Sequence, residues 1–157
     1  MLSRRQILVS GSGLAALAAF PAAAAAKQRF PYQLSEAEWR KRLSPAAFAV
    51  LRKDATERAG TSPLNREKRR GTYHCAGCGQ ALFHSRTKYE SGTGWPSFYA
   101  PIRGAVATST DYKLVLPRTE VHCSRCGGHL GHRFDDGPPP TGKRYCMNGV
   151  ALSFRPA

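Results

Sequence analysis

The five cysteines of this chain fall into two groups with different chemistry. Four of them form two Cys-x-x-Cys pairs, Cys75 with Cys78 and Cys123 with Cys126. Two such pairs can supply four thiolates to one tetrahedral Zn²⁺, a closed site whose role is structural. A disulfide within each pair is the alternative in an oxidising compartment. The glycines beside each pair form tight turns and favour zinc.

The fifth cysteine, Cys146, has no partner in this scheme and is a candidate nucleophile. It lies between Arg144 and Asn148, and a cationic neighbour favours the reactive thiolate. His129 and His132 are three residues apart, a spacing that can bind metal. With no carboxylate between them, and zinc already matched by four cysteines, they are better suited to hydrogen bonding or proton transfer. Two solvent-facing loop histidines are the plainer alternative.

The segment 91–98 presents an aromatic side chain on a constrained turn. Two glycines permit the turn, and Pro96 fixes the backbone directly after Trp95. An indole held in this way serves either as a core anchor or as a platform for a substrate. The residues alone favour the core anchor.

Two short helices are expected before the cysteine pairs. Ser35 and Glu38 have the spacing of a capping box, which predicts a helix through Leu43. Ser44 followed by proline predicts a second helix over 46–59, stopped by a glycine.

Beyond residue 71 the pattern changes to strands. Short segments rich in Tyr, Phe, Val and Thr alternate with Gly and Pro. The expected strands are 71–75, 81–84, 97–99, 105–110, 113–117, 121–122, 132–135, 144–147 and 151–155. The chain length allows one domain, assigned to 35–157. The predicted fold class is mainly β, a small zinc-stapled antiparallel domain with short N-terminal helices.

The first 26 residues resemble an export signal. Arg4 and Arg5 form a twin-arginine pattern, followed by an apolar run over 9–20 and an alanine tract that ends at Ala26. The run is shorter than the roughly 20 residues of a spanning helix. We expect cleavage near Ala26, a linker over 27–34, and a periplasmic protein without a stable membrane anchor. An uncleaved anchor or a flexible basic tail are the alternatives.

The net charge is strongly positive, +14 for the whole chain and +12 once Arg4 and Arg5 are removed with the signal. Such a charge suits nucleic acid. However, the basic residues are dispersed and no aromatic residues interleave with them on one element. We therefore expect no nucleic-acid partner, and interpret the charge as a solvated surface.

Three motifs together carry a family resemblance. They are Ser-Gly-x-Gly-Trp-Pro-Ser-Phe at 91–98, His-x-Gly-His-x-Phe at 129–134 and Arg-Tyr-Cys-x-Asn at 144–148, interleaved with the two cysteine pairs. In this order they resemble the B-type methionine sulfoxide reductases, over roughly 33–154. The resemblance implies two facing antiparallel sheets, a structural zinc and N-terminal helices. It also implies reduction of the R epimer of methionine sulfoxide, in proteins more readily than free.

Site roles follow from the same resemblance. Cys146 would be the nucleophile, Trp95 would line the pocket for the substrate's S-methyl group, and Phe134 would form a wall. Four polar residues would act at the sulfoxide oxygen or beside the nucleophile: His129, His132, Arg144 and Asn148.

The chain departs from the family pattern at Thr93, where many members carry a resolving cysteine. No cysteine remains for that task here, so we expect an external thiol or a thioredoxin-like donor to regenerate Cys146. Two other readings remain open. A binding module would explain Trp95 and Phe134 but not Cys146 beside Arg144. A basic zinc ribbon would bind nucleic acid with steep salt dependence.

Overall fold

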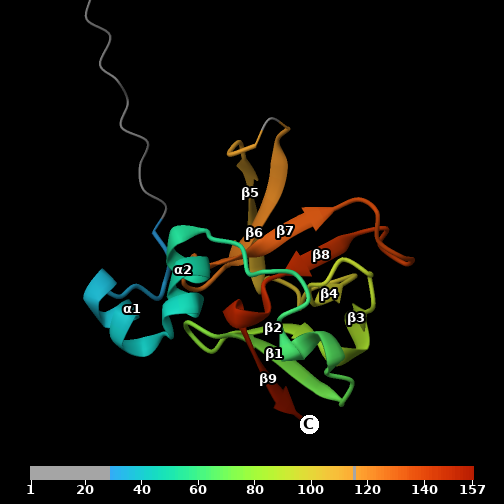
Figure 1. The fold of residues 1–157 in the computed structure, drawn as a ribbon, viewed down its shortest axis with the longest axis horizontal. Helices are drawn as coiled ribbons and strands as arrows, with labels where there is room; N and C mark the ends of the chain where they lie inside the picture. Colours follow the sequence, from blue (N-terminus) through green and yellow to red (C-terminus); the bar gives the residue numbers. More distant parts are fainter. Residues whose placement is uncertain (1–28, 115) are drawn as a thin grey trace, which may run out of the picture.

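The structure, a computed structural model, describes residues 29–114 and 116–157. The expected export signal and the first residues of the linker lie outside the described residues. Short strands dominate the described chain and form two antiparallel sheets (Figure 1). The strands are β1 (Gly71–Cys75), β2 (Ala81–His84), β3 (Lys88–Tyr89), β4 (Ser97–Phe98), β5 (Val106–Asp111), β6 (Arg118–Cys123), β7 (His129–Phe134), β8 (Arg144–Met147) and β9 (Leu152–Pro156). The predicted fold class is confirmed.

The smaller sheet has the order β2-β1-β9 and the larger one β3-β4-β8-β7-β6-β5. They face each other through stacked aromatic rings. Phe83 of β2 stacks on Phe98 of β4 with ring centroids 4.3 Å apart, and Tyr73 of β1 meets Phe98 at 4.9 Å. All three are among the largest fully buried side chains of the described residues, so buried aromatic rings join the two sheets.

The two helices begin where their caps predict. In α1 (Glu36–Arg42) the Ser35 side chain accepts from the Glu38 backbone N–H, and the Glu38 side chain accepts from that of Ser35. Ser44 caps α2 (Pro45–Lys53) in a similar way. The predicted extent of the second helix, to residue 59, is wrong. It ends at Lys53 because Asp54 adopts a left-handed conformation with φ 53°.

One expected strand is also wrong. Residues 113–117 belong to the connection between β5 and β6, and none of those described is in a strand. The Asp111 side chain accepts the backbone N–H of Lys113 at 2.9 Å, which turns the chain at the end of β5. Three short 3₁₀ segments, η1 (Pro63–Arg66), η2 (Ser85–Thr87) and η3 (Gly149–Ala151), complete the described elements.

The register of the larger sheet fixes the position of the lone cysteine. Cys146 lies on β8 opposite Ser97 of β4 and opposite His132 of β7. Next to it, Gly131 allows β7 and β8 to approach closely, because a Cβ there would lie 2.1 Å from the Cys146 carbonyl oxygen. Strands on both sides therefore hold the backbone of Cys146. Among the described helices, none has the length and apolar character needed to cross a membrane.

Candidate metal centre and active site

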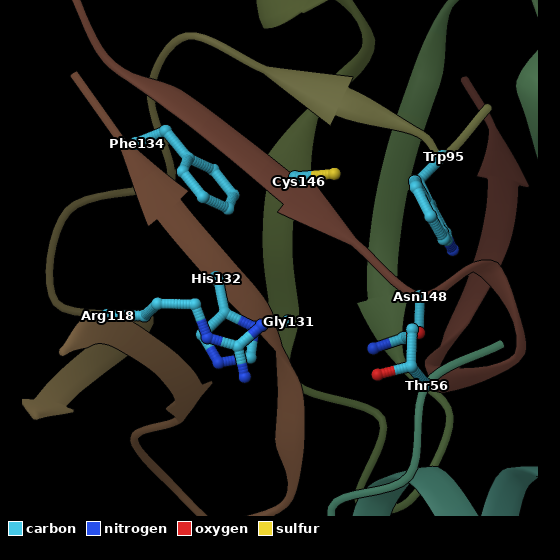
Figure 2. Close-up of a pocket in the computed structure, with 8 residues that line it drawn as sticks. All are labelled: Thr56, Trp95, Arg118, Gly131, His132, Phe134, Cys146 and Asn148. Atoms are coloured by element: carbon cyan, nitrogen blue, oxygen red, sulfur yellow. The ribbon is translucent and has the colours of Figure 1, made fainter. Parts of the chain in front are cut away.

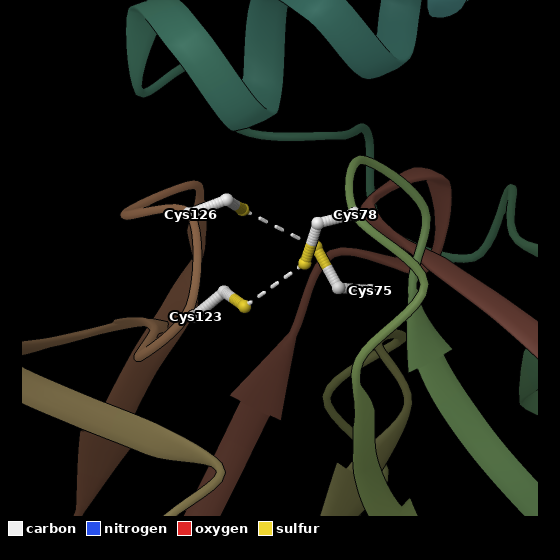
Figure 3. Close-up of side chains that lie close together, drawn as sticks. All are labelled: Cys75, Cys78, Cys123 and Cys126. Atoms are coloured by element: carbon white, nitrogen blue, oxygen red, sulfur yellow. Dashed lines mark hydrogen bonds between the residues drawn. The ribbon is translucent and has the colours of Figure 1, made fainter. Parts of the chain in front are cut away.

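The four paired cysteines converge at the ends of β1 and β6 (Figure 3). The Sγ atoms of Cys75 and Cys126 are 3.7 Å apart, and those of Cys78 and Cys123 are 3.6 Å apart. Thiolates bound at 2.3 Å around a tetrahedral Zn²⁺ lie about 3.8 Å from each other, whereas a disulfide needs about 2.05 Å. All four residues are buried. None of the four forms a disulfide, within a pair or between pairs, and their Sγ atoms all lie within 4.8 Å of one another. The cluster therefore fits one structural metal ion.

Local backbone bonds shape each Cys-x-x-Cys turn. The N–H of Gly79 donates to the Cys75 carbonyl, and that of Gly127 donates to the Cys123 carbonyl, both at 2.8 Å. Their φ angles are 76° and 67°, a region that glycine enters without strain. This turn chemistry is what the sequence indicated.

Two arginines join the helices to the cysteine turns. Arg42 at the end of α1 donates to the Gly77 carbonyl at 2.6 Å, and Arg52 of α2 donates to the Cys126 carbonyl at 3.1 Å. Each turn is therefore held by a helix as well as by its place in the cysteine cluster.

A separate pocket of about 110 Å³ contains the fifth cysteine. Figure 2 shows the Cys146 sulfur directed toward Trp95, with Phe134 across the pocket. The lining residues are Thr56, Trp95, Arg118, Gly131, His132, Phe134, Cys146 and Asn148. The pocket thus brings together Cys146, Trp95, His132, Phe134 and Asn148, five of the seven residues predicted for catalysis and substrate binding.

The chain between α2 and η1 positions the indole. The Trp95 Nε1–H donates to the Glu57 carbonyl at 2.9 Å. The Glu57 N–H donates to Asn148 Oδ1 at 2.8 Å, and the Asn148 amide donates to the Leu130 carbonyl at 3.0 Å. Asn148 therefore connects β7, β8 and the segment carrying Glu57. Because α2 ends at Lys53, the segment carrying Glu57 is not helical and its backbone can form these hydrogen bonds.

His129 and His132 of β7 each bind a carboxylate, which comes from the neighbouring strand β6 for His129 and from the next strand, β5, for His132. Because a carboxylate only accepts, His132 donates from Nε2 to Asp111 and His129 donates from Nδ1 to Glu120, both at 2.8 Å. Burial lowers the pKa of His132, and the Asp111 hydrogen bond partly opposes that shift. The bond from His129 lowers the pKa of Glu120 to about 2.

The two histidines have different surroundings. His132 lines the Cys146 pocket, whereas His129 lines an adjoining polar cavity of about 310 Å³ that also borders His132. Their ring centroids are 5.3 Å apart. His132 is therefore the imidazole that reaches the pocket directly, and His129 lies behind it.

Arg144 lies beside the pocket without lining it. It shares a face of β8 with Cys146, since alternate residues of a strand point the same way. Its guanidinium makes two 2.8 Å hydrogen bonds to Asp136 and stacks 4.3 Å above the Phe134 ring. The Asp136 carboxylate raises the pKa of Arg144. The guanidinium is thus a fixed positive charge that also supports Phe134.

A hydroxyl group lies close to the Cys146 sulfur. Thr93 Oγ1 is 3.7 Å from Cys146 Sγ. Ser91 links Thr93 at 2.8 Å to Ser97 at 2.7 Å, so a chain of hydroxyls leads away from the sulfur. The other four cysteines all belong to the buried cluster.

Sequence reasoning missed several residues around the pocket. Thr56 and Arg118 line it, and Asp111 and Glu120 bind the two histidines. No local motif indicates these carboxylates, because they reach the histidines across the sheet from β5 and β6. Both residues also lie just outside the predicted strands, since Asp111 follows the expected strand 105–110 and Glu120 precedes the expected strand 121–122, whereas the structure includes them in β5 and β6.

The fold and the pocket define a class. The β fold carries a half-buried thiol, an aromatic-walled pocket and a carboxylate-bound imidazole beside a buried cysteine cluster. These are the parts of an enzyme that uses cysteine as a nucleophile.

Comparison with known proteins narrows the class to a family. The SelR domain model matches residues 43–156. Proteins named peptide methionine sulfoxide reductase MsrB are similar over most of their length. That of Leptospira interrogans is 52% identical over 77% of this chain and 93% of its own. That of Methanosarcina barkeri is 55% identical over 77% and 86%, and that of Pseudomonas putida strain W619 is 54% identical over 76% and 90%. The chain belongs to the B-type peptide methionine sulfoxide reductases, as its motifs predicted.

Proposed function

We propose that this protein reduces methionine-R-sulfoxide in polypeptides through a sulfenic acid on Cys146. The observation that carries the proposal is the Cys146 sulfur in a pocket walled by Trp95 and Phe134. A cavity of about 150 Å³ holds benzene, so the 110 Å³ of this pocket suits the methyl sulfoxide end of one side chain. Aromatic walls favour the S-methyl group, and the thiol lies beside them.

The proposed first step joins thiol, sulfoxide and proton donor. The Cys146 thiolate attacks the sulfoxide sulfur while the oxygen is protonated. The oxygen then passes to the cysteine, which leaves methionine and Cys146 sulfenic acid, so the substrate gains the two electrons that the cysteine loses. His132 is the proposed proton donor. Its Nε2 is engaged by Asp111, which leaves Nδ1 to carry the proton to the oxygen.

The second half of the cycle needs a thiol from outside. Every other cysteine belongs to the buried metal cluster. We propose that a small thiol or a thioredoxin-like protein condenses with the sulfenic acid, releasing water, and that a second thiol then frees Cys146. Zn²⁺, held by Cys75, Cys78, Cys123 and Cys126, would stabilise the fold and take no part in these steps.

The proposed place of action is the periplasm, where the enzyme would repair oxidised envelope proteins. The support is the twin-arginine pattern at Arg4 and Arg5 with the alanine tract that follows. Attaching residues 1–26 to a reporter and changing both arginines to lysine tests this. We expect periplasmic reporter for the natural segment and cytoplasmic reporter for the changed one. Equal export of both would contradict the twin-arginine route.

The reductase itself is tested with a racemic methionine sulfoxide peptide and dithiothreitol. We expect the metal-loaded protein to consume only the R epimer, and Cys146→Ser to consume neither. A Cys146→Ser protein that still binds the peptide separates loss of chemistry from loss of binding. Undiminished turnover by this variant would remove Cys146 from the mechanism.

A further inference from the structure

An apolar groove opens beside the catalytic pocket where the larger sheet divides. Thr119 of β6 pairs with Arg133 of β7, but beyond this pair the two strands separate. Arg118 pairs with β5, and Phe134 pairs with Arg144 of β8. Figure 1 shows the β5–β6 hairpin rising away from β7 and β8.

The groove between the β5–β6 hairpin and the β7–β8 hairpin is large and lined mostly by apolar surface. Its volume is about 740 Å³, within the range of ligand sites in proteins. Its lining residues are Leu114, Leu116, Pro117, Arg118, Thr119, Arg133, Phe134 and Asp135. Leu114 and Leu116 are 59% and 75% exposed. Two exposed leucines so close together in sequence on one projecting hairpin are unusual for a surface that contacts only solvent.

The groove adjoins the pocket of Cys146. Phe134 and Arg118 line both cavities. A molecule with one side chain beside Cys146 therefore has its neighbouring atoms at the mouth of the groove. The 110 Å³ pocket holds little more than the end of one side chain, so the remainder of a polypeptide substrate must lie elsewhere.

We propose that this groove binds the polypeptide segment next to the oxidised methionine, and that it favours substrates with a large apolar residue there. The proposal rests on the reductase activity and adds a sequence preference to it. Leu114 and Leu116 would contact the apolar residue, and Phe134 would separate it from the methionine sulfoxide. The natural clients are then unfolded or loosely folded segments in which apolar residues are accessible.

The test compares substrates of two sizes with dithiothreitol as the reductant. The first is N-acetylmethionine-R-sulfoxide, which reaches only the pocket. The others are two peptides that differ only in having leucine or serine on each side of the methionine sulfoxide. In the natural protein we expect kcat/KM for the leucine peptide to exceed that for the serine peptide about tenfold, mainly through KM.

The key variant is Leu114→Ser with Leu116→Ser. These side chains are exposed, so their replacement leaves the fold intact. We expect kcat/KM for the leucine peptide to fall about tenfold, with the small substrate and the serine peptide changed less than about twofold. Thr108→Ser is the control, because Thr108 is exposed on β5 of the same hairpin and lines neither the groove, the pocket nor the cavity of the two histidines. We expect it to behave like the natural protein.

Several outcomes would overturn the proposal. Equal rates for the two peptides in the natural protein, or an equal loss for all substrates in the double variant, would remove the groove from substrate choice. A loss seen only when thioredoxin replaces dithiothreitol would assign the groove to the reductant. A loss of self-association in sedimentation would assign it to a second copy. Failure of the reductase itself is separate, because the small substrate would then not react.

Discussion

The Thr93 hydroxyl oxygen lies 3.7 Å from the Cys146 sulfur. This short distance allows a direct test of the proposed cycle, in which Cys146 is the only reacting cysteine of the chain. In Thr93→Cys we expect a disulfide between the new thiol and Cys146 after one turnover. The side chain at position 93 starts close to the Cys146 sulfur, so a small movement brings the two sulfurs to the disulfide bond length of about 2.05 Å.

The disulfide is measured by peptide mapping after reaction with substrate and no added thiol. The natural protein treated in the same way should keep its sulfenic acid, trapped by a dimedone-type reagent. Sulfenic acid persisting in the variant would show that the Thr93 position cannot reach the nucleophile.

The imidazole beside the nucleophile depends on a carboxylate, which predicts a pH effect. Burial lowers the pKa of His132, and the bond to Asp111 raises it in part. If the protonated ring donates to the sulfoxide oxygen, the reductive step slows as pH rises through that pKa. Asp111→Asn should therefore move this limb of the single-turnover pH profile to lower pH and slow the step at pH 7 by about tenfold.

Glu36→Gln is a suitable control, since Glu36 pairs with Arg40 on the exposed face of α1. An unchanged pH profile in Asp111→Asn would contradict the role of the pair.

Asp111 also affects stability. Its folded pKa is lowered, first by the Lys113 N–H and next by His132. The stabilisation is therefore complete above its ordinary pKa of about 3.9 and is lost as pH falls below it.

At the scale of the elements, strands β7 and β8 lie in close backbone contact at Gly131, beside Cys146. A Cβ on Gly131 would meet the Cys146 carbonyl oxygen at 2.1 Å, which the strands can relieve only by moving apart. We expect Gly131→Ala to lower the free energy of unfolding by about 1–3 kcal/mol and to reduce activity strongly, since Cys146 shifts with its strand. Chemical denaturation and the peptide assay measure the two effects.

Gly104→Ala provides the comparison. Gly104 has φ 74° and open space around it, so alanine there meets only backbone strain, about 1–2 kcal/mol. Its activity should stay close to natural. If Gly131→Ala also kept full activity, the close approach of β7 and β8 would not matter for the position of Cys146.

Local signals predicted the elements to different extents. The caps at Ser35 and Ser44 fixed both helix starts, because capping depends on residues adjacent in sequence. The end of α2 could not be predicted in the same way. Asp54 takes a left-handed conformation, and the chain after it is held by Glu57 bonds to Trp95 and Asn148. These bonds join residues far apart in sequence.

In the candidate site, too, the sequence predicted some residues and not others. Motifs indicated Cys146, Trp95 and His132, and the pocket brings them together. Their assigned roles remain predictions. The carboxylates Asp111 and Glu120 have no motif of their own, and only the register of β5, β6 and β7 brings them to the histidines.

For the whole molecule, the cysteine cluster is a second link between the two sheets, besides the buried aromatic rings. Its ligands come from the end of β1 in one sheet and of β6 in the other. We expect one zinc per chain by elemental analysis. Strong chelation should lower the melting temperature by more than about 10 °C, because metal binding to such a site contributes several kcal/mol to folding.

Cys146→Ser serves as the control and should retain its zinc and its melting temperature. The cluster would not be a metal site if the purified protein contained no metal and mass spectrometry found the four cysteines as disulfides.

The unequal burial of the five sulfurs also sets an order of damage. The four cluster cysteines are at most 7% exposed, whereas Cys146 is open to its pocket. A diffusing oxidant therefore meets the Cys146 thiol first and converts it to the same sulfenic acid that the proposed catalysis produces, which thiols can reverse. Under rising oxidant the protein would stop working before it starts to unfold, and returning reductant would restore it without new synthesis.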